Sequence, residues 1–399
     1  MSRQLTSGVL SRVKFKIESM QWDATDSDPV VHPTGFPDFD YFKKIKLVTL
    51  NDALEETSEL ATWNNPTITG NTDGTDGQVM VRFPKLWYKE HYNIDGWLTG
   101  IELSSKAAPD LTLHPKFSWG NGRDYIYVGA YEASEVDGKL CSVSGQPVRT
   151  NINMDEFTTP AIARDTANQQ TSQWHIYDYW TEHLINLLFY VYYGNLHGRT
   201  ALPGYTDGTW PDLRLTGRSN ILSTVNGSVQ ADFDGVDSDL VGRISEANET
   251  IANRFLFVEN IFGHIWKFLY GAAFDGRIGA KKTAYLTPDP RLFSVTPANV
   301  LANYTDMDID LLSVDTTSFV KATGRALLPV EGGASSATYY CARMFSYLTD
   351  AADRNYLRSV LAGGALIYGN NAGIACRYSL HVLTLAHPYR GSRLCAEKI

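Results

Sequence analysis

The sequence has few cysteines, no excess of basic residues and no long apolar run. Its four cysteines lie at no CxxC spacing, which excludes a disulfide framework or a cysteine-rich zinc site. The 35 basic and 44 acidic side chains give a net charge of −9, so nucleic acid is not an expected partner. The longest apolar run, residues 184–193, contains Asn186 and is shorter than the roughly 20 residues that span a bilayer. We therefore expect no membrane insertion.

The signatures of several enzyme classes are also missing. The nucleophile motif GxSxG, the zinc motif HExxH, the phosphate-binding Walker loop and a strand-linked GxGxxG do not occur. The sequence therefore offers no candidate catalytic residue, and we expect a protein that is not an enzyme. The first ten residues lack the pattern of a secretory signal, so synthesis in the cytosol is expected.

Core-forming residues are abundant. Hydrophobic residues make up 43% of the chain and aromatic residues 12%, which excludes a disordered protein and predicts a packed core. Alternating or short apolar runs predict strands at 13–17, 45–50, 79–83, 86–92 and 125–130. The Gly- and Asp-rich stretch 64–77 predicts a linker. We therefore expect a mainly β module over residues 1–77, for attachment or oligomerisation, and a larger domain over 78–399.

One helix and one long loop region follow. Apolar residues recur at three- and four-residue intervals over 175–193, which predicts a five-turn helix ending before Gly194. His175 and His183 lie too far apart on it for a zinc-protease pair, so we interpret both as structural or surface residues. Residues 194–254 predict long loops. Their aspartates lack the glycine and glutamate positions of an EF-hand: Asp232, Asp234, Asp237 and Asp239.

Two C-terminal stretches carry a family resemblance. The first is 253–268, with Glu259-Asn260, Gly263 and Ile-Trp-Lys-Phe at 265–268; the second is Gly363-Gly364, followed by Gly391-Ser-Arg393. In this order and spacing they resemble the signature of C-type lectin folds of the formylglycine-generating-enzyme type, although Ala362 replaces the family's arginine. The resemblance implies an α+β fold. In physical terms the glycines allow close backbone approach, Trp266 offers a large buried face, and Arg393 can pin a terminal loop.

Upstream segments extend the resemblance. The stretches 82–89, 113–117, 127–134 and 187–194, and more weakly Met20-Gln-Trp-Asp23, are similar to phage variable proteins of diversity-generating retroelements, which include tropism determinants. In formylglycine-generating enzymes a copper-binding cysteine pair follows the double glycine. Tyr368 and Gly373 stand at those places here, and Cys376 alone cannot supply two thiolates. The resemblance thus implies binding and no copper oxidase chemistry.

In those phage proteins the segment after the double glycine is varied by mutation of adenines in asparagine codons. Residues 363–395 contain no Lys, Glu, Gln, Met or Trp, the residue types tested that such mutation cannot reach. An ordinary buried hairpin and loop would be the alternative. Tyr offers broad contact area at low entropic cost, and His can add pH-dependent contacts. The predicted ligand-binding residues are Ala365, Ile367, Tyr368, Tyr378, Leu380, His381, Leu385, His387, Pro388 and Tyr389.

The resemblance implies a receptor-binding protein of a phage tail, made in the host cytoplasm and carried on the virion. It would bind a host-surface protein or glycan, contact other tail proteins and form a homotrimer. Two alternatives stay open: a structural tail component whose segment does not vary, and an enzyme of the formylglycine-generating type. No cofactor is expected, although a structural calcium ion is compatible with such folds.

Overall fold

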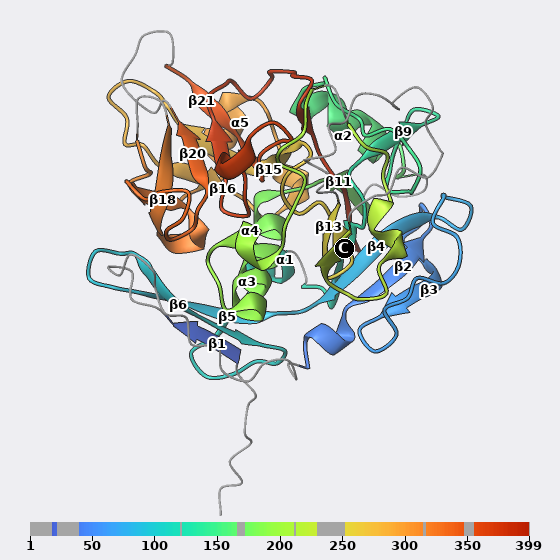
Figure 1. Cartoon of the computed structure of the whole chain (residues 1–399). Coiled ribbons are helices and arrows are strands. Elements are labelled where there is room, and N and C mark those ends of the chain that lie inside the picture. The colour runs from blue at the N-terminus through green and yellow to red at the C-terminus, as the bar shows by residue number, and fades with distance from the viewer. Residues whose placement is uncertain are drawn as a thin grey trace, which may run out of the picture.

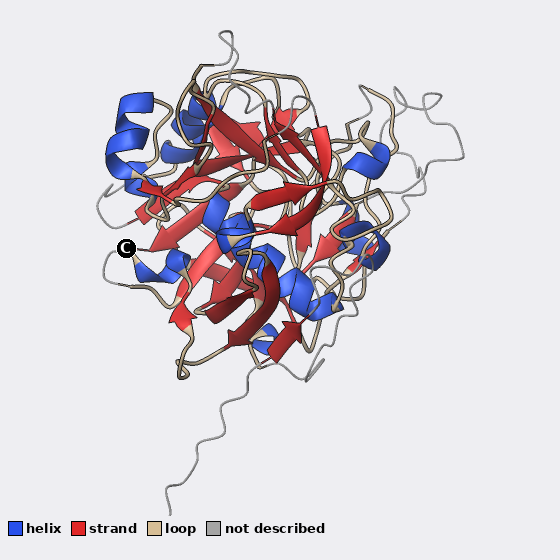
Figure 2. Ribbon diagram, turned by 90° about the vertical axis from the view of Figure 1, so that its left-hand side faces the viewer, coloured by secondary structure: helices blue, strands red, loops and turns tan. Residues whose placement is uncertain are grey.

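The chain is a mixed α+β protein that consists mostly of sheet, with few helices. The computed structural model describes residues 18–21, 40–119, 122–165, 172–210, 213–229, 252–313, 317–346 and 355–398. Figure 2 shows that the strands curl into a half-barrel. The α+β class expected from the sequence is therefore confirmed. The expected strand at 13–17 and the four aspartates between 232 and 239 lie outside the described residues.

A six-stranded sheet contains the C-terminal strand, which is the second strand from one edge (Figure 1). Strand β2 pairs with β4 over five residues, so the sheet crosses the boundary predicted at residue 77. Residues 46–62 therefore belong to the main body rather than to a separate module, because their partner strand lies beyond the predicted linker. The strand order is β11 (Ser172–Ile176), β24 (Leu394–Lys398), β8 (Tyr125–Gly129), β4 (Gln78–Pro84), β2 (Lys46–Leu50) and β3 (Glu56–Thr62).

The central helix α3 (Tyr179–Tyr193) starts four residues later than predicted. The Asp178 side chain accepts hydrogen bonds from the backbone N–H of Trp180 and Thr181 and caps the helix. Residues 172–176 instead pair with β24, so His175 lies on a strand. The helix ends where predicted, at Gly194 in the left-handed conformation (φ 55°). Because every side chain from Tyr179 to Val191 is buried, α3 is a core helix.

A nine-stranded sheet carries Trp266 and Gly391, which together with Gly263, Gly363, Gly364 and Arg393 are called the frame. Its longest strand, β15 (Trp266–Asp275), is buried along all ten residues, and an isolated bridge from Asp178 to Tyr270 joins it to the start of α3. Strand β23 pairs in parallel with β15. The strands are β17 (Thr305–Asp306), β16 (Ala284–Leu286), β15 (Trp266–Asp275), β21 (Leu357–Ala362), β22 (Arg377–Ser379), β20 (Arg343–Ser346), β18 (Thr317–Thr323), β19 (Pro329–Gly332) and β23 (Arg390–Gly391).

The remaining elements surround these two sheets. A four-stranded sheet contains β1 (Glu18–Gln21), β6 (Leu98–Ser104), β5 (Trp87–Tyr92) and β7 (Thr112–Leu113). Two smaller sheets contain β9 (Ser134–Val136), β10 (Lys139–Cys141), β12 (Gly227–Ser228), β13 (Asn253–Phe255) and β14 (Val258–Glu259). The other α-helices are α1 (Pro115–Ser118), α2 (Met154–Ile162), α4 (Gly198–Ala201) and α5 (Pro297–Asn303). The 3-10 turns are η1 (Phe42–Lys44), η2 (Arg218–Ile221), η3 (Pro290–Leu292), η4 (Arg325–Leu327) and η6 (Gly369–Asn371).

One large buried cluster joins the two main sheets. It contains Val48 of the six-stranded sheet and Phe268 of the nine-stranded sheet, so both share a hydrophobic core. Within the described ranges, no helix has the length and apolar character that a bilayer span requires.

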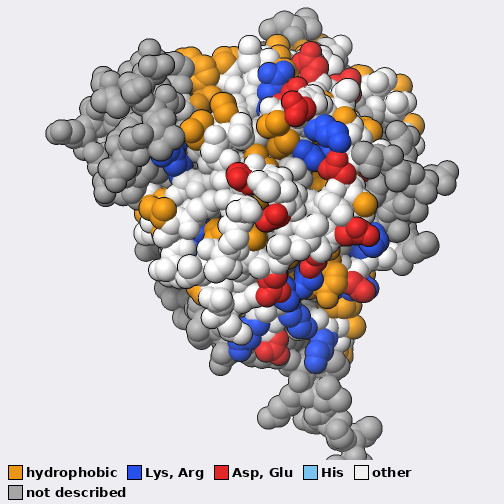
Figure 3. Space-filling model, turned by 90° about the vertical axis from the view of Figure 1, so that its right-hand side faces the viewer, with side chains coloured by type: hydrophobic (Ala, Val, Ile, Leu, Met, Phe, Trp, Pro, Cys, Tyr) orange, Lys and Arg blue, Asp and Glu red, His pale blue; other side chains and the backbone are white. Residues whose placement is uncertain are grey.

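Charged side chains of both signs alternate on the side where β2 and β3 lie in Figure 1. Lys46 pairs with Glu59 and Arg82 with Glu56. Figure 3 shows Lys and Arg side chains next to Asp and Glu on this face, without an extended area of one sign. Such a face does not create the one-sided potential that steers a highly charged partner.

Candidate ligand-binding surface

The glycines of the frame lie where side chains would not fit. Gly363 and Gly364 have φ of 88° and 80°, and a Cβ on Gly364 would lie 2.5 Å from the Ala372 Cβ. A Cβ on Gly263 would lie 2.5 Å from the Tyr205 carbonyl oxygen. A Cβ on Gly391 would lie 2.4 Å from a methyl carbon of Ile265. The role predicted for these glycines, close backbone approach, is confirmed.

Arg393 connects three segments from within the core. Its guanidinium donates hydrogen bonds to the carbonyl oxygens of Gly129 (3.0 Å), Glu259 (2.5 Å) and Asn260 (3.4 Å), and the residue is 1% exposed. The planar donor fork suits such a set of carbonyls. Arg393 therefore fixes the C-terminal end of the segment, as predicted.

His264 joins several segments through hydrogen bonds, a role that its place in the sequence does not reveal. Its backbone N–H donates to the Tyr205 carbonyl, and its own carbonyl accepts from the Leu366 N–H (3.0 Å). Its ring Nε2 accepts from the Arg214 N–H (2.8 Å), so Nδ1 carries the proton and donates to Glu132. Burial alone would raise the pKa of Glu132, but the contacts with His264 and Lys267 lower it to about 2.

A loop from the predicted loop region lies directly against the segment. The Gly208 N–H donates to the Leu366 carbonyl, and the Gly369 N–H donates to the Thr206 carbonyl, both at 2.7 Å. A guanidinium N–H of Arg199 donates to the Asn370 side chain at 2.5 Å. The described part of the region 194–254 is therefore loop-rich, as predicted, and neighbouring segments pin it.

The ten predicted ligand-binding residues differ in exposure. Ile367 is 41% exposed. Ala365 is fully buried and Tyr378, at 9% exposed, is buried as well, so these two predicted binding residues belong to the core rather than to the surface. The other seven are half-buried: Tyr368, Leu380, His381, Leu385, His387, Pro388 and Tyr389.

Trp266 supports part of this surface from below. Its ring centroid lies 5.0 Å from that of Tyr368 and 5.2 Å from that of Tyr378. The Tyr378 hydroxyl lies 2.8 Å from His381 Nε2, and the Arg390 guanidinium lies 5.1 Å from the Tyr378 ring centroid. As predicted, Trp266 presents a large buried face, and two of the predicted binding residues, Tyr368 and Tyr378, pack on it.

A second aromatic group includes a residue from outside the segment. The ring centroid of Trp210 lies 4.3 Å from that of Tyr389, at an interplanar angle of 90°, and His387 packs on the same tyrosine at 4.9 Å. Trp210 is half-buried. Sequence reasoning missed it because a single tryptophan in a loop has no periodicity or motif.

The two histidines of the surface are held uncharged. Burial and the nearby Arg390 lower the pKa of His381 to about 4 and also lower the pKa of His387. Both imidazoles are therefore neutral at physiological pH. The predicted pH-dependent contacts would require conditions well below neutrality.

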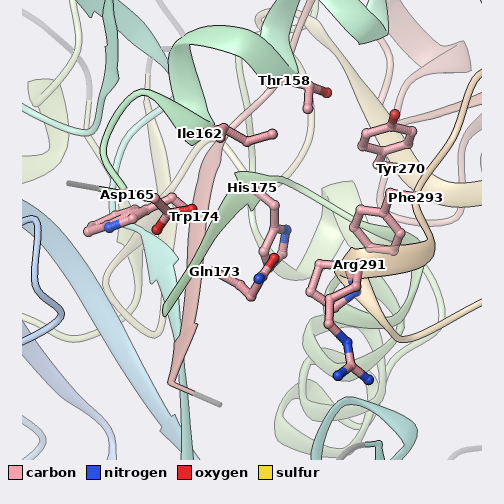
Figure 4. A pocket seen from close by; sticks show the side chains of 10 residues that line it. Thr158, Ile162, Asp165, Gln173, Trp174, His175, Tyr270, Arg291 and Phe293 are labelled. Atoms are coloured by element: carbon pink, nitrogen blue, oxygen red, sulfur yellow. The ribbon is translucent and has the colours of Figure 1, made fainter. Parts of the chain in front are cut away.

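A separate cavity of about 580 Å³ opens between α2, β11 and the 290–293 segment. Figure 4 shows His175 in the middle, with Ile162 and Gln173 on one side and Tyr270, Phe293 and Arg291 on the other. His175 Nδ1 donates to the Ile176 carbonyl at 2.7 Å. The cavity shares no residue with the predicted segment.

The described residues include one group with the composition of a metal site. Ligand atoms of His175, Asp178 and Glu397 lie within 4.8 Å of one another. The Lys116 ammonium group already contacts both carboxylates, and Arg123 pairs with Glu397. Burial would raise the pKa of Glu397, but these cations and His175 lower it to about 2. The carboxylates are thus neutralised by side chains, so this donor set does not fit a metal ion.

The cysteines show no arrangement for redox chemistry. All four are buried and none forms a disulfide, and burial raises the pKa of the Cys376 thiol to about 12. A thiol of this kind is protonated at neutral pH and is a poor nucleophile or copper ligand.

Comparison with known proteins adds no assignment, since neither a protein-family model nor a curated protein matches this sequence.

Proposed function

We propose that the chain is a ligand-binding protein with a C-type lectin fold of the formylglycine-generating-enzyme type. It acts as the receptor-binding, tropism-determining protein of a phage tail. The segment 363–395 contacts a host-surface protein or glycan. The single observation that carries this proposal is that a buried frame holds both ends of a segment in which several apolar and aromatic side chains are exposed or half-buried, among them Ile367, Leu380 and Tyr389.

The frame supports binding because the residues that fix the fold differ from the residues that would contact the ligand. Gly363, Gly364 and Gly391 meet backbone or core atoms, and Arg393 bonds to carbonyl oxygens, so these residues define the path of the chain. Ile367 and the half-buried residues project from that path. Their exchange alters the surface with little effect on the core, which is what a diversified binding site requires.

The place of the protein follows from this function. We propose that it resides on the virion tail, after synthesis in the host cytoplasm, and contacts other tail proteins. Attachment and trimer formation would involve the N-terminal residues, which precede the strands that enter the main sheet. A structural tail component without variation is the alternative. An adjacent reverse transcriptase and a near-copy of the 363–395 coding segment, differing mainly at adenines, would favour diversification over that alternative.

The direct test is adsorption of labelled protein to intact host cells. A variant with Ile367, Leu380, His387 and Tyr389 all changed to Ala should lose adsorption and remain folded by circular dichroism. A matched control changes exposed side chains elsewhere and should adsorb normally: Ile94, Ile221, Ile278 and Leu292, each to Ala. Equal adsorption of both folded variants would remove the binding assignment.

A further inference from the structure

The two surface histidines each have one ring nitrogen that is already bonded. The Tyr389 backbone N–H donates to His387 Nδ1 at 3.3 Å, so the proton of this neutral ring lies on Nε2. His381 Nε2 lies 2.8 Å from the Tyr378 hydroxyl. The Arg390 guanidinium donates to the oxygen of that hydroxyl, which therefore gives its own hydrogen to His381 and leaves the proton of the ring on Nδ1. Each imidazole keeps one N–H group for which no described residue is an acceptor.

The main chain holds both histidines in place. The His381 carbonyl accepts a hydrogen bond from the Ser359 N–H at 3.0 Å. The His387 carbonyl accepts from the N–H groups of Arg390 (3.0 Å) and Asn151 (3.2 Å). Both histidines are partly exposed. We call their two outer N–H groups, His381 Nδ1–H and His387 Nε2–H, the donor pair. Donors whose backbone is fixed beforehand lose little freedom when a ligand binds.

The charge next to the donor pair is positive. Burial, Arg390, His387 and Arg358 lower the pKa of His381, so the two imidazoles lie close enough to interact. Burial and Arg390 lower the pKa of His387. Arg390 is 2% exposed, donates to the Leu385 carbonyl, and forms no ion pair with a carboxylate of the described residues. Because buried charges in proteins are normally paired, Arg390 lacks a counter-charge.

The segment itself supplies no negative charge. Residues 363–395 contain no Asp or Glu, although the whole chain has a net charge of −9. The exposed Asp207 lies beside Gly369 at the margin of the surface and interacts with Arg199. The donor pair therefore favours an anion, whereas a long polyanion would also meet the negative charge of the rest of the protein.

An aromatic ring adjoins the donor pair. The ring centroid of Tyr389 lies 4.9 Å from that of His387, and Tyr389 is half-buried. The face of an aromatic ring is negative and attracts the slightly positive C–H groups of a sugar. Hydrogen bonds from N–H groups to an oxyanion are among the strong ones. Donors, cation and ring together suit a sugar that carries one carboxylate or phosphate group.

We propose that the donor pair binds the oxyanion of an acidic sugar in a host-surface glycan. The oxyanion accepts hydrogen bonds from His381 Nδ1–H and His387 Nε2–H, and Arg390 supplies the counter-charge from within the core. The sugar ring packs on Tyr389. This inference rests on the proposed function, and of the protein and the glycan named there it selects the glycan.

The experiment follows the histidine ring signals of the whole protein by NMR at pH 7.5 during addition of small probes. Glucuronate or glucose 6-phosphate should shift the signals of His381 and His387 with a Kd of about 1–10 mM, and neutral glucose should bind at least about tenfold more weakly. His387→Phe and Arg390→Met should each weaken binding of the acidic probe about tenfold. The control His91→Phe removes a half-buried histidine that pairs with Glu102 and should leave binding unchanged.

The outcomes separate this inference from the proposed function. Acidic probes that bind no more tightly than glucose would overturn it, and N-acetylglutamate binding as tightly as glucuronate would indicate an acidic peptide instead of a sugar. Should Arg390→Met not fold, unchanged binding by folded His387→Phe overturns the proposal alone. If the acidic probes fail while the fourfold Ala variant of the segment loses adsorption, the oxyanion site is wrong and the binding surface stands. If that variant adsorbs normally, the proposed function fails as well.

Discussion

The frame and the exposed part of the segment are adjacent in sequence but differ in how they are held. Gly364 and Arg393 act through backbone geometry and buried hydrogen bonds, and both are buried. The side chains of Ile367 and Leu380 are exposed and half-buried, respectively. The fold therefore specifies the backbone path of the segment, while several of its side chains remain accessible to a ligand.

The largest loss of stability is expected when Arg393, the buried cation of the frame, is replaced. Arg393→Met should destabilise the protein by about 3–5 kcal/mol, because three buried carbonyl groups lose their donor. Urea unfolding measures the loss. The control Arg82→Met removes a partly exposed pair with Glu56 and should cost less than about 1 kcal/mol. Equal losses of unfolding free energy in the two variants would mean that the buried hydrogen bonds of Arg393 do not stabilise the frame.

A smaller but still large effect is expected at the double glycine. Gly364→Ala should cost roughly 2–4 kcal/mol, because the new Cβ meets Ala372 and the backbone is left-handed. Gly96→Ala shares a positive φ of 77° but meets nothing within 4 Å, so it should cost about 1 kcal/mol. The double variant Gly364→Ala/Ala372→Gly should recover part of the difference in thermal melts. No recovery would show that the close approach is not the cause.

The buried histidines should make stability sensitive to acid. Burial, His183 and Lys116 lower the pKa of His114 well below its usual value, so the unfolded chain binds its proton first as the pH falls. The stability that neutral His114 contributes is thus complete above pH 6.5 and decreases below it. Unfolding free energies measured from pH 7.5 to 5 should fall less steeply for His114→Phe. Parallel curves for the two proteins would contradict this account.

Binding should be less sensitive to the same pH change. The pKa of His381 is about 4 and that of His387 is lowered from its usual value, so both surface histidines are neutral between pH 8 and 7. Adsorption to host cells should therefore be constant over this range and show no transition at the ordinary pKa of histidine. A transition with a midpoint near 6.5 that disappears in His387→Gln would show that this histidine is solvated and charged in the free protein.

The sequence predicts the frame better than the surface around it. Gly364, Trp266 and Arg393 have roles set by backbone angles, size and donor geometry, and these can be inferred from residue type. Contacts between distant segments cannot be inferred in this way. His175 contacts Glu397, 222 residues away, and its strand pairs with residues 394–398, so local periodicity alone predicts a helix where a strand lies. Trp210 reaches the segment only through loop packing.

The predicted boundary at residue 77 shows a related limit. The Gly- and Asp-rich stretch does form turns, but its flanking strands β3 and β4 both pair with β2. Local composition identifies a connection and does not show whether the connected strands share a sheet. Burial of Ala365 has the same origin, because packing against the core is determined by the whole fold.

The most direct test of the account is a scan of residues 363–395, each changed singly to Ala or, where Ala is native, to Ser. Thermal stability and host-cell adsorption are measured for every variant. The account predicts two separate groups: frame positions such as Gly364 and Arg393 lose stability, whereas Ile367, Leu380, His387 and Tyr389 lose adsorption and keep stability. Loss of both quantities at the same positions, with no variant that is stable and deficient in adsorption, would contradict it.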